Sequence, residues 1–465
     1  MKYVSTRGGE DGVSFTSVLL NGLAKDGGLY VPKTFPKFST KDLKRLSHMN
    51  YAELCYQVTK GFISEVDIPH KDYKKICYKT YDKNFGENII NIDKLSENEN
   101  ILNLFHGPTL AFKDFALQLL GNIYDYVLKK KRIELTILGA TSGDTGSAAI
   151  YGCSRSKKIK TFILFPHGKV SETQRKQMTT FKNKNVFCIA IKGDFDDCQK
   201  LVKGFFNYEG KKINLAAVNS INWVRIMGQL VYYFWSYFKV EKNLRRVSYV
   251  VPTGNFGNVY AGYISKKMGL PINKLVVSSN KNDILTRFFE TGVMKLKQTI
   301  KTVSPSMDIQ VSSNFERLLY DYSKSTELVK NLYRDLGMKG YFSVDTKLLD
   351  LMKISFRYGR LNDKETLLSI KEIFKRFRII IDPHTAVGYS IGKTVLDDSE
   401  KRIYLATAHY SKFIDTVKKV INDQVTLPKR ISSIINKKEK FDLLENNLKE
   451  LIQYITEKSC ISRQV

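Results

Sequence analysis

Short apolar runs alternate with amphipathic stretches through the middle of this 465-residue chain. The apolar runs predict strands at residues 135–138, 161–165, 186–192, 247–251, 274–278, 378–381 and 402–406. The stretches between them predict helices, for example at residues 195–207, 258–267 and 385–395. This alternation is typical of parallel sheets whose strands are joined by crossover helices. The predicted fold class is therefore α/β, with ligands expected beyond the carboxyl ends of the strands.

The two ends of the chain lack this alternation. Residues 1–85 favour a separate, mostly helical cap, and the Lys/Glu-rich segment after residue 425 favours a helical tail. The apolar stretch at residues 226–238 is too short to span a bilayer and contains Gln229. We interpret it as a buried aromatic helix.

Two of the predicted strands end in a turn of glycine, hydroxyl and amide residues that opens a helix. The first glycine turn is residues 141–145 (TSGDT), and the second is residues 253–258 (TGNFGN). Free N–H groups and the dipole at a helix start favour an anion, and glycine lets the backbone approach a phosphate closely. A tight strand–helix connection is the alternative interpretation of either turn alone.

Lys113 lies in the segment FHGPTLAFKDF, residues 105–115. Desolvation among apolar neighbours such as Leu110 and Phe112 favours the neutral amine, which is the form that can act as a Schiff-base lysine. A predicted helix follows, with one apolar face at Phe115, Leu119, Ile123 and Val127. In a chain with so many lysines, a solvated side chain is the alternative for Lys113 alone.

Taken together, these segments resemble the threonine synthase family, which uses pyridoxal phosphate and has the tryptophan-synthase-β-like fold. The resemblance covers most of the chain and is to the longer bacterial and fungal form. It begins at YVSTRG (residues 3–8) and DGGLYVP (26–32). It continues through FHGPTLAFKDF, ATSGDTGSAA, NSINW and PTGNFGN, and ends at ATAH (406–409).

The resemblance implies two α/β domains with twisted, mainly parallel sheets and the cofactor in the cleft between them. Residues 1–85 would form the mostly helical N-terminal cap, and residues 86–113 and 241–425 the large cofactor-binding domain. Residues 114–240 would form the small α/β domain, and residues 426–465 a helical C-terminal extension.

The resemblance also implies roles for individual residues. Lys113 would bind pyridoxal phosphate covalently and then serve as acid and base at the substrate. The cofactor phosphate would be held by Gly254, Asn255, Phe256, Gly257 and Asn258. The Thr407 hydroxyl would meet the pyridine nitrogen. A left-handed turn residue is the alternative for Asn255, and an ordinary strand residue is the alternative for Thr407.

The first glycine turn is similar to the loop that holds the substrate α-carboxylate in related enzymes, which implies substrate-binding roles for Ser142, Gly143, Asp144 and Thr145. An ionised Asp144 near the cofactor's phenolate oxygen would be repelled, so it must point away, pair with a cation or hold a proton. Further candidates for binding the substrate, in particular its phosphate group, are Lys169, Ser171, Asn222 and Arg225. A solvated surface position is the alternative for these residues.

The activity implied by the resemblance is a lyase reaction, the last step of threonine biosynthesis. O-phospho-L-homoserine and water would give L-threonine and phosphate through γ-elimination and β-addition. One alternative is a threonine-synthase-like phospho-lyase that makes no threonine, and a remote one is a basic nucleic-acid-binding protein.

The net charge of +29 comes from 75 Lys and Arg against 46 Asp and Glu. These charges are spread along the chain, which favours a solvated surface and a small-molecule substrate over a nucleic-acid or membrane partner.

The six cysteines form no Cys-x-x-Cys pair and argue against a metal site. With the polar N-terminus, they predict a soluble protein with reduced thiols and favour a cytoplasmic location. A monomer or a homodimer is expected, although no pattern in the sequence decides between them.

Overall fold

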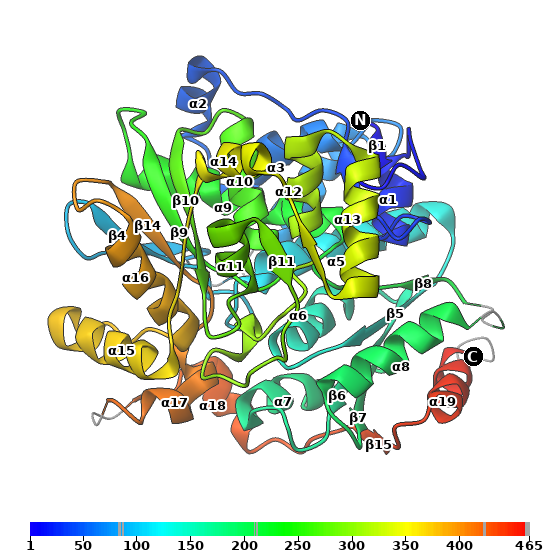
Figure 1. Cartoon of the computed structure of the whole chain (residues 1–465). Helices are drawn as coiled ribbons and strands as arrows, with labels where there is room; N and C mark the ends of the chain where they lie inside the picture. Colours follow the sequence, from blue (N-terminus) through cyan, green and yellow to red (C-terminus); the bar gives the residue numbers. More distant parts are fainter. Residues whose placement is uncertain (82–84, 86–87, 209, 211–212, 422–424, 461–465) are drawn as a thin grey trace. The chain divides into compact units, whose positions relative to one another are not determined.

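The computed structural model describes residues 1–81, 85, 88–208, 210, 213–421 and 425–460 (Figure 1). The chain forms two compact units. Unit 1 comprises Met1–Phe112 and Ser220–Val425, and unit 2 comprises Lys113–Asn219 and Thr426–Val465. Each unit contains a mainly parallel sheet with helices packed on it, which confirms the predicted α/β class.

The sheet of unit 1 has six strands in the order β13-β10-β9-β14-β4-β3. They are β3 (Asn91–Lys94), β4 (Glu99–Asn103), β9 (Val247–Pro252), β10 (Ile272–Ser279), β13 (Phe356–Arg360) and β14 (Arg402–Ala406). Neighbouring strands are parallel except β3, which runs antiparallel to β4. Because β9 and β14 are parallel neighbours, the segments that follow them leave the same edge of the sheet.

The main helices of unit 1 pack on the two faces of this sheet or on one another. They are α9 (Trp223–Val240), α10 (Gly257–Lys267), α11 (Ile284–Thr291), α12 (Phe315–Ser323), α13 (Thr326–Lys339), α14 (Thr346–Lys353), α15 (Asp363–Phe377), α16 (Pro383–Val395) and α17 (Ile414–Val417). Short 3-10 helices lie at Pro305–Met307 (η3) and Tyr410–Phe413 (η4), and β11 (Val293–Lys295) pairs with β12 (Tyr341–Ser343).

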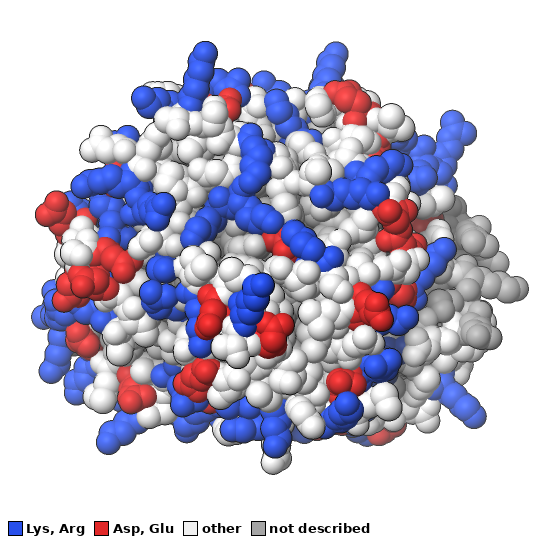
Figure 2. Space-filling model, turned by 45° about the horizontal axis from the view of Figure 1, so that its top comes forward, with Lys and Arg blue, Asp and Glu red and all other residues white. Residues whose placement is uncertain are grey.

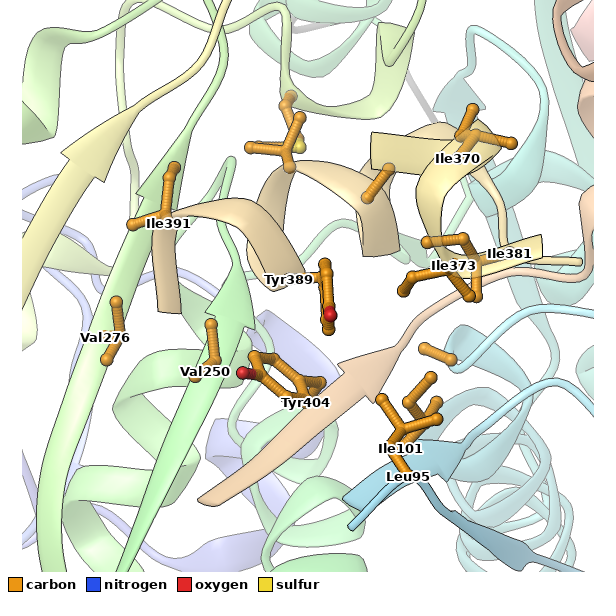
Figure 3. Packing of buried hydrophobic residues seen from close by; sticks show 14 of the residues in the cluster. Leu95, Ile101, Val250, Val276, Ile370, Ile373, Ile381, Tyr389, Ile391 and Tyr404 are labelled. Atoms are coloured by element: carbon orange, nitrogen blue, oxygen red, sulfur yellow. The ribbon is translucent and has the colours of Figure 1, made fainter. Parts of the chain in front are cut away.

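Alternate residues of the strands face different helices. Figure 3 shows Val250 of β9 and Tyr404 of β14 beside Tyr389 of α16, in a cluster that is closed to solvent. Tyr249, the neighbour of Val250, packs instead on Tyr233 of α9, with ring centroids 4.9 Å apart. Since successive strand residues point to opposite faces, α16 and α9 cover opposite sides of the sheet.

The first part of unit 1 is mostly helical. It contains α1 (Phe15–Asn21), α2 (Thr40–Leu46), α3 (Tyr51–Thr59), η1 (Lys60–Phe62) and α4 (His70–Thr80), together with the antiparallel pair β1 (Tyr3–Ser5) and β2 (Tyr30–Pro32). Side-chain caps start three of these helices, at Ser14, Ser39 and Asn50.

The sheet of unit 2 is entirely parallel, in the order β15-β7-β6-β5-β8. Its strands are β5 (Leu135–Ala140), β6 (Ile159–Pro166), β7 (Val186–Ile191), β8 (Leu215–Ala216) and β15 (Asp442–Leu444). Its helices are α5 (Lys113–Lys131), α6 (Asp144–Cys153), α7 (Glu172–Thr179), α8 (Phe195–Asn207), α18 (Lys429–Ile435) and α19 (Leu448–Cys460). The predicted face of α5 is buried along its length.

One predicted strand is wrong. Residues 378–381 connect α15 to α16 without forming a strand. Arg378 has a left-handed backbone, with φ 58°, and ends α15 as its C-cap. The apolar run after it supplies Ile381 to the core from a connecting segment, so its hydrophobicity reports burial and not strand pairing.

The compact units differ from the predicted domains in several places. The predicted cap at residues 1–85 is part of unit 1, and Lys113 is part of unit 2. Helix α9, which includes the predicted aromatic helix at residues 226–238, packs within unit 1. Residues from Thr426 onward pack within unit 2, where α19 lies against α8 and β15 extends the sheet. The predicted division into domains stays a prediction.

The surface carries charges of both signs. On the face drawn in Figure 2, lysine and arginine side chains lie among aspartate and glutamate side chains, without gathering into a single basic patch. Within the described ranges, we find no helix that is long and apolar enough to cross a membrane. Five cysteine thiols are buried and free: Cys55, Cys77, Cys153, Cys188 and Cys198. The side chain of Cys460 lies outside the described part.

Candidate active site

Lys113 is the first residue of α5, in unit 2. Its Nζ donates a hydrogen bond to Oδ2 of Asp144 at 3.3 Å. The two side chains are only 12% and 5% exposed, so the pair is shielded from water. Of the three arrangements expected for Asp144, the structure has the one in which the carboxylate pairs with a cation.

Gln174, on α7, holds the other oxygen of this carboxylate. Its Nε2 donates to Oδ1 of Asp144 at 2.8 Å, and its Oε1 accepts from the Ser171 hydroxyl at 2.9 Å. A carboxylate only accepts, so the NH₂ group of Gln174 must face Asp144. Gln174 is not among the residues predicted for the site. The Ser-x-x-Gln spacing of Ser171 and Gln174 indicates a helix start, but it does not reveal the contact with Asp144.

The first glycine turn connects β5 to α6. The Thr141 hydroxyl accepts from the N–H groups of Gly143 and Gly146, both at 2.9 Å, which closes the turn. Gly143 has φ +142°, and a Cβ there would lie 2.5 Å from the Gln174 side chain, so only glycine fits. Ser142 is exposed and Asp144 is buried at the start of the ten-residue helix α6.

The remaining candidates of unit 2 lie after β6. Lys169 is exposed, which agrees with the solvated alternative for this residue, whereas Ser171 caps α7 by accepting from the Gln174 N–H at 3.3 Å. Thr145 is half-buried in the first turn of α6. The structure therefore brings Lys113, Asp144 and Ser171 together through Gln174.

The second glycine turn connects β9 to α10 in unit 1. Phe256 has φ 63° and is the N-cap of α10, so the left-handed position suggested for Asn255 belongs to Phe256. A Cβ at Gly254 would lie 2.7 Å from the Ser306 carbonyl oxygen, which leaves room only for glycine. Gly257 and Asn258 then form the first turn of an eleven-residue helix.

Asn258 gives the second glycine turn a buried hydrogen-bond donor. Its Oδ1 accepts from the hydroxyls of Tyr232 at 2.8 Å and Tyr233 at 2.9 Å. Its Nδ2 has no hydrogen-bond partner among the described residues, although Asn258 is only 7% exposed. A helix start with a spare buried donor suits an anion with several acceptor oxygens, and the phosphate of pyridoxal phosphate fits that description.

Thr407 follows β14, the strand beside β9. Its carbonyl accepts from the Phe112 N–H at 2.9 Å, and Ala111 pairs with Ala408 in an antiparallel bridge. Thr407 is 6% exposed. It therefore lies at the same edge of the sheet as the second glycine turn, and its main chain is bonded to the residue that directly precedes Lys113.

Asn222 and Arg225 belong to the start of α9, also in unit 1. The Oδ1 of Asn222 accepts from the Val224 N–H at 3.1 Å, and its Nδ2 donates to the Leu19 carbonyl at 3.0 Å. Arg225 is 3% exposed, and burial lowers the pKa of its guanidinium to about 10. The solvated interpretation is therefore wrong for both residues, while their contact with a substrate stays a prediction.

His409 completes the segment after β14. Its Nδ1 lies 2.8 Å from the Ser411 hydroxyl and accepts from the Ser411 N–H at 3.2 Å. Burial, followed by the influence of His106, lowers the pKa of the His409 imidazole to about 4. An accepting Nδ1 carries no proton, so this geometry also requires the neutral ring.

Stability is therefore expected to depend on pH through His409. The unfolded chain binds a proton near pH 6.5 and the folded chain only near pH 4, so neutral His409 stabilises the fold above pH 6.5 and loses this contribution as the pH falls toward 4. Between pH 7 and pH 5 the free energy of unfolding should fall by about 2 kcal/mol more in the unaltered protein than in His409→Asn. Urea unfolding at both pH values measures this difference, and equal losses would contradict it.

Comparisons with known proteins agree with these features. The family models described as "Threonine synthase N terminus", "Pyridoxal-phosphate dependent enzyme" and "Threonine synthase, C-terminal" match residues 2–81, 101–331 and 385–455. The threonine synthase of Pseudomonas aeruginosa is 42% identical to the chain, over 98% of each protein.

Two solved structures are similar over nearly the whole chain. The structure of pyridoxal-phosphate-bound threonine synthase from Brucella melitensis has 41% identity and a TM-score of 0.96, covering 99% of this chain and 100% of that one. Yeast threonine synthase has 37% identity and a TM-score of 0.93, covering 98% of each chain. The chain therefore belongs to the threonine synthase family of pyridoxal-phosphate-dependent lyases.

Proposed function

We propose that this protein converts O-phospho-L-homoserine and water into L-threonine and phosphate, with pyridoxal phosphate bound to Lys113. The observation that carries the proposal is the buried contact of Lys113 Nζ with Asp144, at the start of the helix that follows the FHGPTLAFKDF segment. Shielding from water favours the neutral amine, the form that attaches covalently, and the carboxylate stabilises the ammonium that forms when the amine takes a proton.

The second glycine turn and Thr407 would hold the cofactor. The N–H groups at the start of α10 and the spare Nδ2 of Asn258 would be donors for its phosphate, and the Thr407 hydroxyl would orient its ring nitrogen. When bound, pyridoxal phosphate supplies an electron sink for negative charge that develops on the substrate carbons. Thr407 carries no charge and so gives the ring nitrogen a hydrogen bond without fixing a proton there.

Lys113 would move the protons of the reaction. Its amine would take a proton from the α carbon, return that proton to the bound substrate and cofactor, and then be free to take one from the β carbon. Asp144 would stabilise the ammonium formed each time. Gln174 keeps the carboxylate in place by bonding its other oxygen. Because both side chains are buried, their attraction is stronger than it would be in water.

The first glycine turn would bind the α-carboxylate of the substrate at the start of α6, through Ser142, Gly143 and Thr145. The candidates for binding the substrate phosphate are Lys169, Ser171, Asn222 and Arg225. Arg225 is buried, so its charge would attract the phosphate more strongly than a solvated charge would. Phosphate would leave from the γ carbon, water would add at the β carbon, and the protons removed earlier would be returned to the γ and α carbons. Exclusion of bulk water protects the charged species between these steps.

A product assay tests this proposal. Purified protein loaded with pyridoxal phosphate receives O-phospho-L-homoserine, and phosphate, threonine and 2-oxobutyrate are measured together. The proposal expects one threonine for each phosphate. Phosphate and 2-oxobutyrate without threonine would instead support the phospho-lyase. The cytoplasmic location and the monomeric or homodimeric state remain predictions.

A further inference from the structure

Arg317, in the first turn of α12, is a fully buried cation that joins three distant segments of unit 1. Its Nε donates to the Tyr30 carbonyl at 3.0 Å, and its Nη2 donates to the Ile221 carbonyl at 2.6 Å. Its Nη1 donates to Oδ1 of Asn314. The guanidinium also lies over the Trp223 ring, 5.5 Å from its centroid.

This contact fixes the orientation of the Asn314 amide. A guanidinium only donates hydrogen bonds, so Asn314 must present its oxygen to Arg317 and its NH₂ group to the opposite side. There Nδ2 donates to the Asn255 carbonyl at 3.1 Å and to the Ser220 carbonyl at 3.2 Å. The main-chain N–H of Asn314 donates to the same Asn255 carbonyl at 3.1 Å.

Residues 312–314 thereby donate hydrogen bonds to two carbonyl groups of the second glycine turn. The Ser312 hydroxyl donates to the Gly254 carbonyl at 2.7 Å, next to the bonds from Asn314 to Asn255. In a trans peptide the C=O and N–H bonds point in opposite directions. Fixing the carbonyls of Gly254 and Asn255 therefore directs the N–H groups of Asn255 and Phe256 away from residues 312–314.

We propose that Asn314, oriented by Arg317, is a positioning residue that aims the N–H groups of the second glycine turn at the cofactor phosphate. The inference rests on the proposed function, because it takes this turn to be the phosphate site. Asn314 acts through Asn255 and Ser220. The Asn314 Nδ2 also lies 3.3 Å from the place that a Cβ on Gly257 would occupy, so the amide lies close to a second position of the turn.

The test compares pyridoxal phosphate with pyridoxal, which lacks the phosphate. Each is titrated into cofactor-free protein, and its dissociation constant is read from the absorbance band that the bound aldehyde produces. Asn314→Asp keeps an oxygen for Arg317 but replaces the donor that faces the Asn255 carbonyl by an acceptor. We expect it to bind pyridoxal phosphate about tenfold more weakly and pyridoxal within about twofold of the unaltered protein.

Two further variants complete the design. Arg317→Lys keeps the charge but loses the forked donors, and we expect a smaller loss that is again selective for the phosphate. Asn331→Asp makes the same chemical change on the half-exposed side of α13 and should leave both dissociation constants unchanged. Thermal unfolding of each cofactor-free variant is followed in parallel.

Equal weakening of both aldehydes by Asn314→Asp, or weakening of neither, would overturn the inference. If this variant does not fold, Ser312→Ala replaces it, since it removes only the hydroxyl that bonds the Gly254 carbonyl, and the same two results would overturn the inference. Unaltered protein that shows no preference for pyridoxal phosphate over pyridoxal would instead contradict the proposed function, and the inference would fail with it.

Discussion

Replacing Lys113 by alanine should abolish the visible absorbance band of the cofactor-loaded protein and lower threonine formation by about 10³-fold or more. The substitution removes the amine that we propose attaches the cofactor and moves protons at the substrate. Asp144 would then lose the cation that lies 3.3 Å from its Oδ2. Absorbance spectra and initial rates at saturating cofactor measure both effects.

Lys131→Ala is the matched control, because Lys131 is exposed in the last turn of the same helix. It should retain the band and the rate. A Lys113→Ala protein that kept the band and made threonine at the unaltered rate would show that another residue carries the cofactor.

Replacing Gly121 by alanine should destabilise unit 2 by about 3 kcal/mol or more. Helices α5 and α6 cross with their backbones in contact: a Cβ at Gly121 would lie 1.9 Å from the Gly152 carbonyl oxygen. A Cβ at Gly152 would likewise lie 2.3 Å from the Leu117 carbonyl oxygen. Backbone atoms cannot rotate away as a side chain can, so the helices themselves must separate.

Separation of these helices would also change the geometry of the candidate site. Because α5 begins at Lys113 and α6 at Asp144, the crossing at Gly121 and Gly152 sets how their starts lie. We therefore expect Gly121→Ala to lose activity as well as stability. Urea unfolding followed by circular dichroism measures the loss of stability, and an unchanged midpoint would contradict the packing argument.

Gly337→Ala provides the control for that substitution. Gly337 lies within α13, with no atom within 4 Å of its would-be Cβ. Alanine favours a helix by up to about 1 kcal/mol over glycine, so this variant should be as stable as the unaltered protein or more so.

The sequence predicted the elements that have a strong local pattern. The periodicity at residues 195–207 predicted α8 with its observed bounds, and that at 402–406 predicted β14. The prediction of a strand at 378–381 was wrong because an apolar run reports burial in any backbone conformation. Strands β8 and β15 are only two and three residues long, too short to show a period.

The residues of the candidate site likewise differ in whether the local sequence reveals them. Lys113 and the two glycine turns have local signatures, because each sits where a helix starts. Gln174 and Arg317 have none, since their partners are far away in sequence: Gln174 bonds Asp144, 30 residues before it, and Arg317 bonds Tyr30, 287 residues before it. Such contacts arise from the tertiary fold, which a single sequence does not display.

Borohydride reduction followed by peptide mapping shows which lysine carries the cofactor. Reduction converts the bond between the cofactor and its lysine into a stable amine, so the modified residue can be located by mass spectrometry. We expect one phosphopyridoxyl group, on the peptide that contains Lys113. A group on another lysine, or no modified peptide from cofactor-saturated protein, would contradict it.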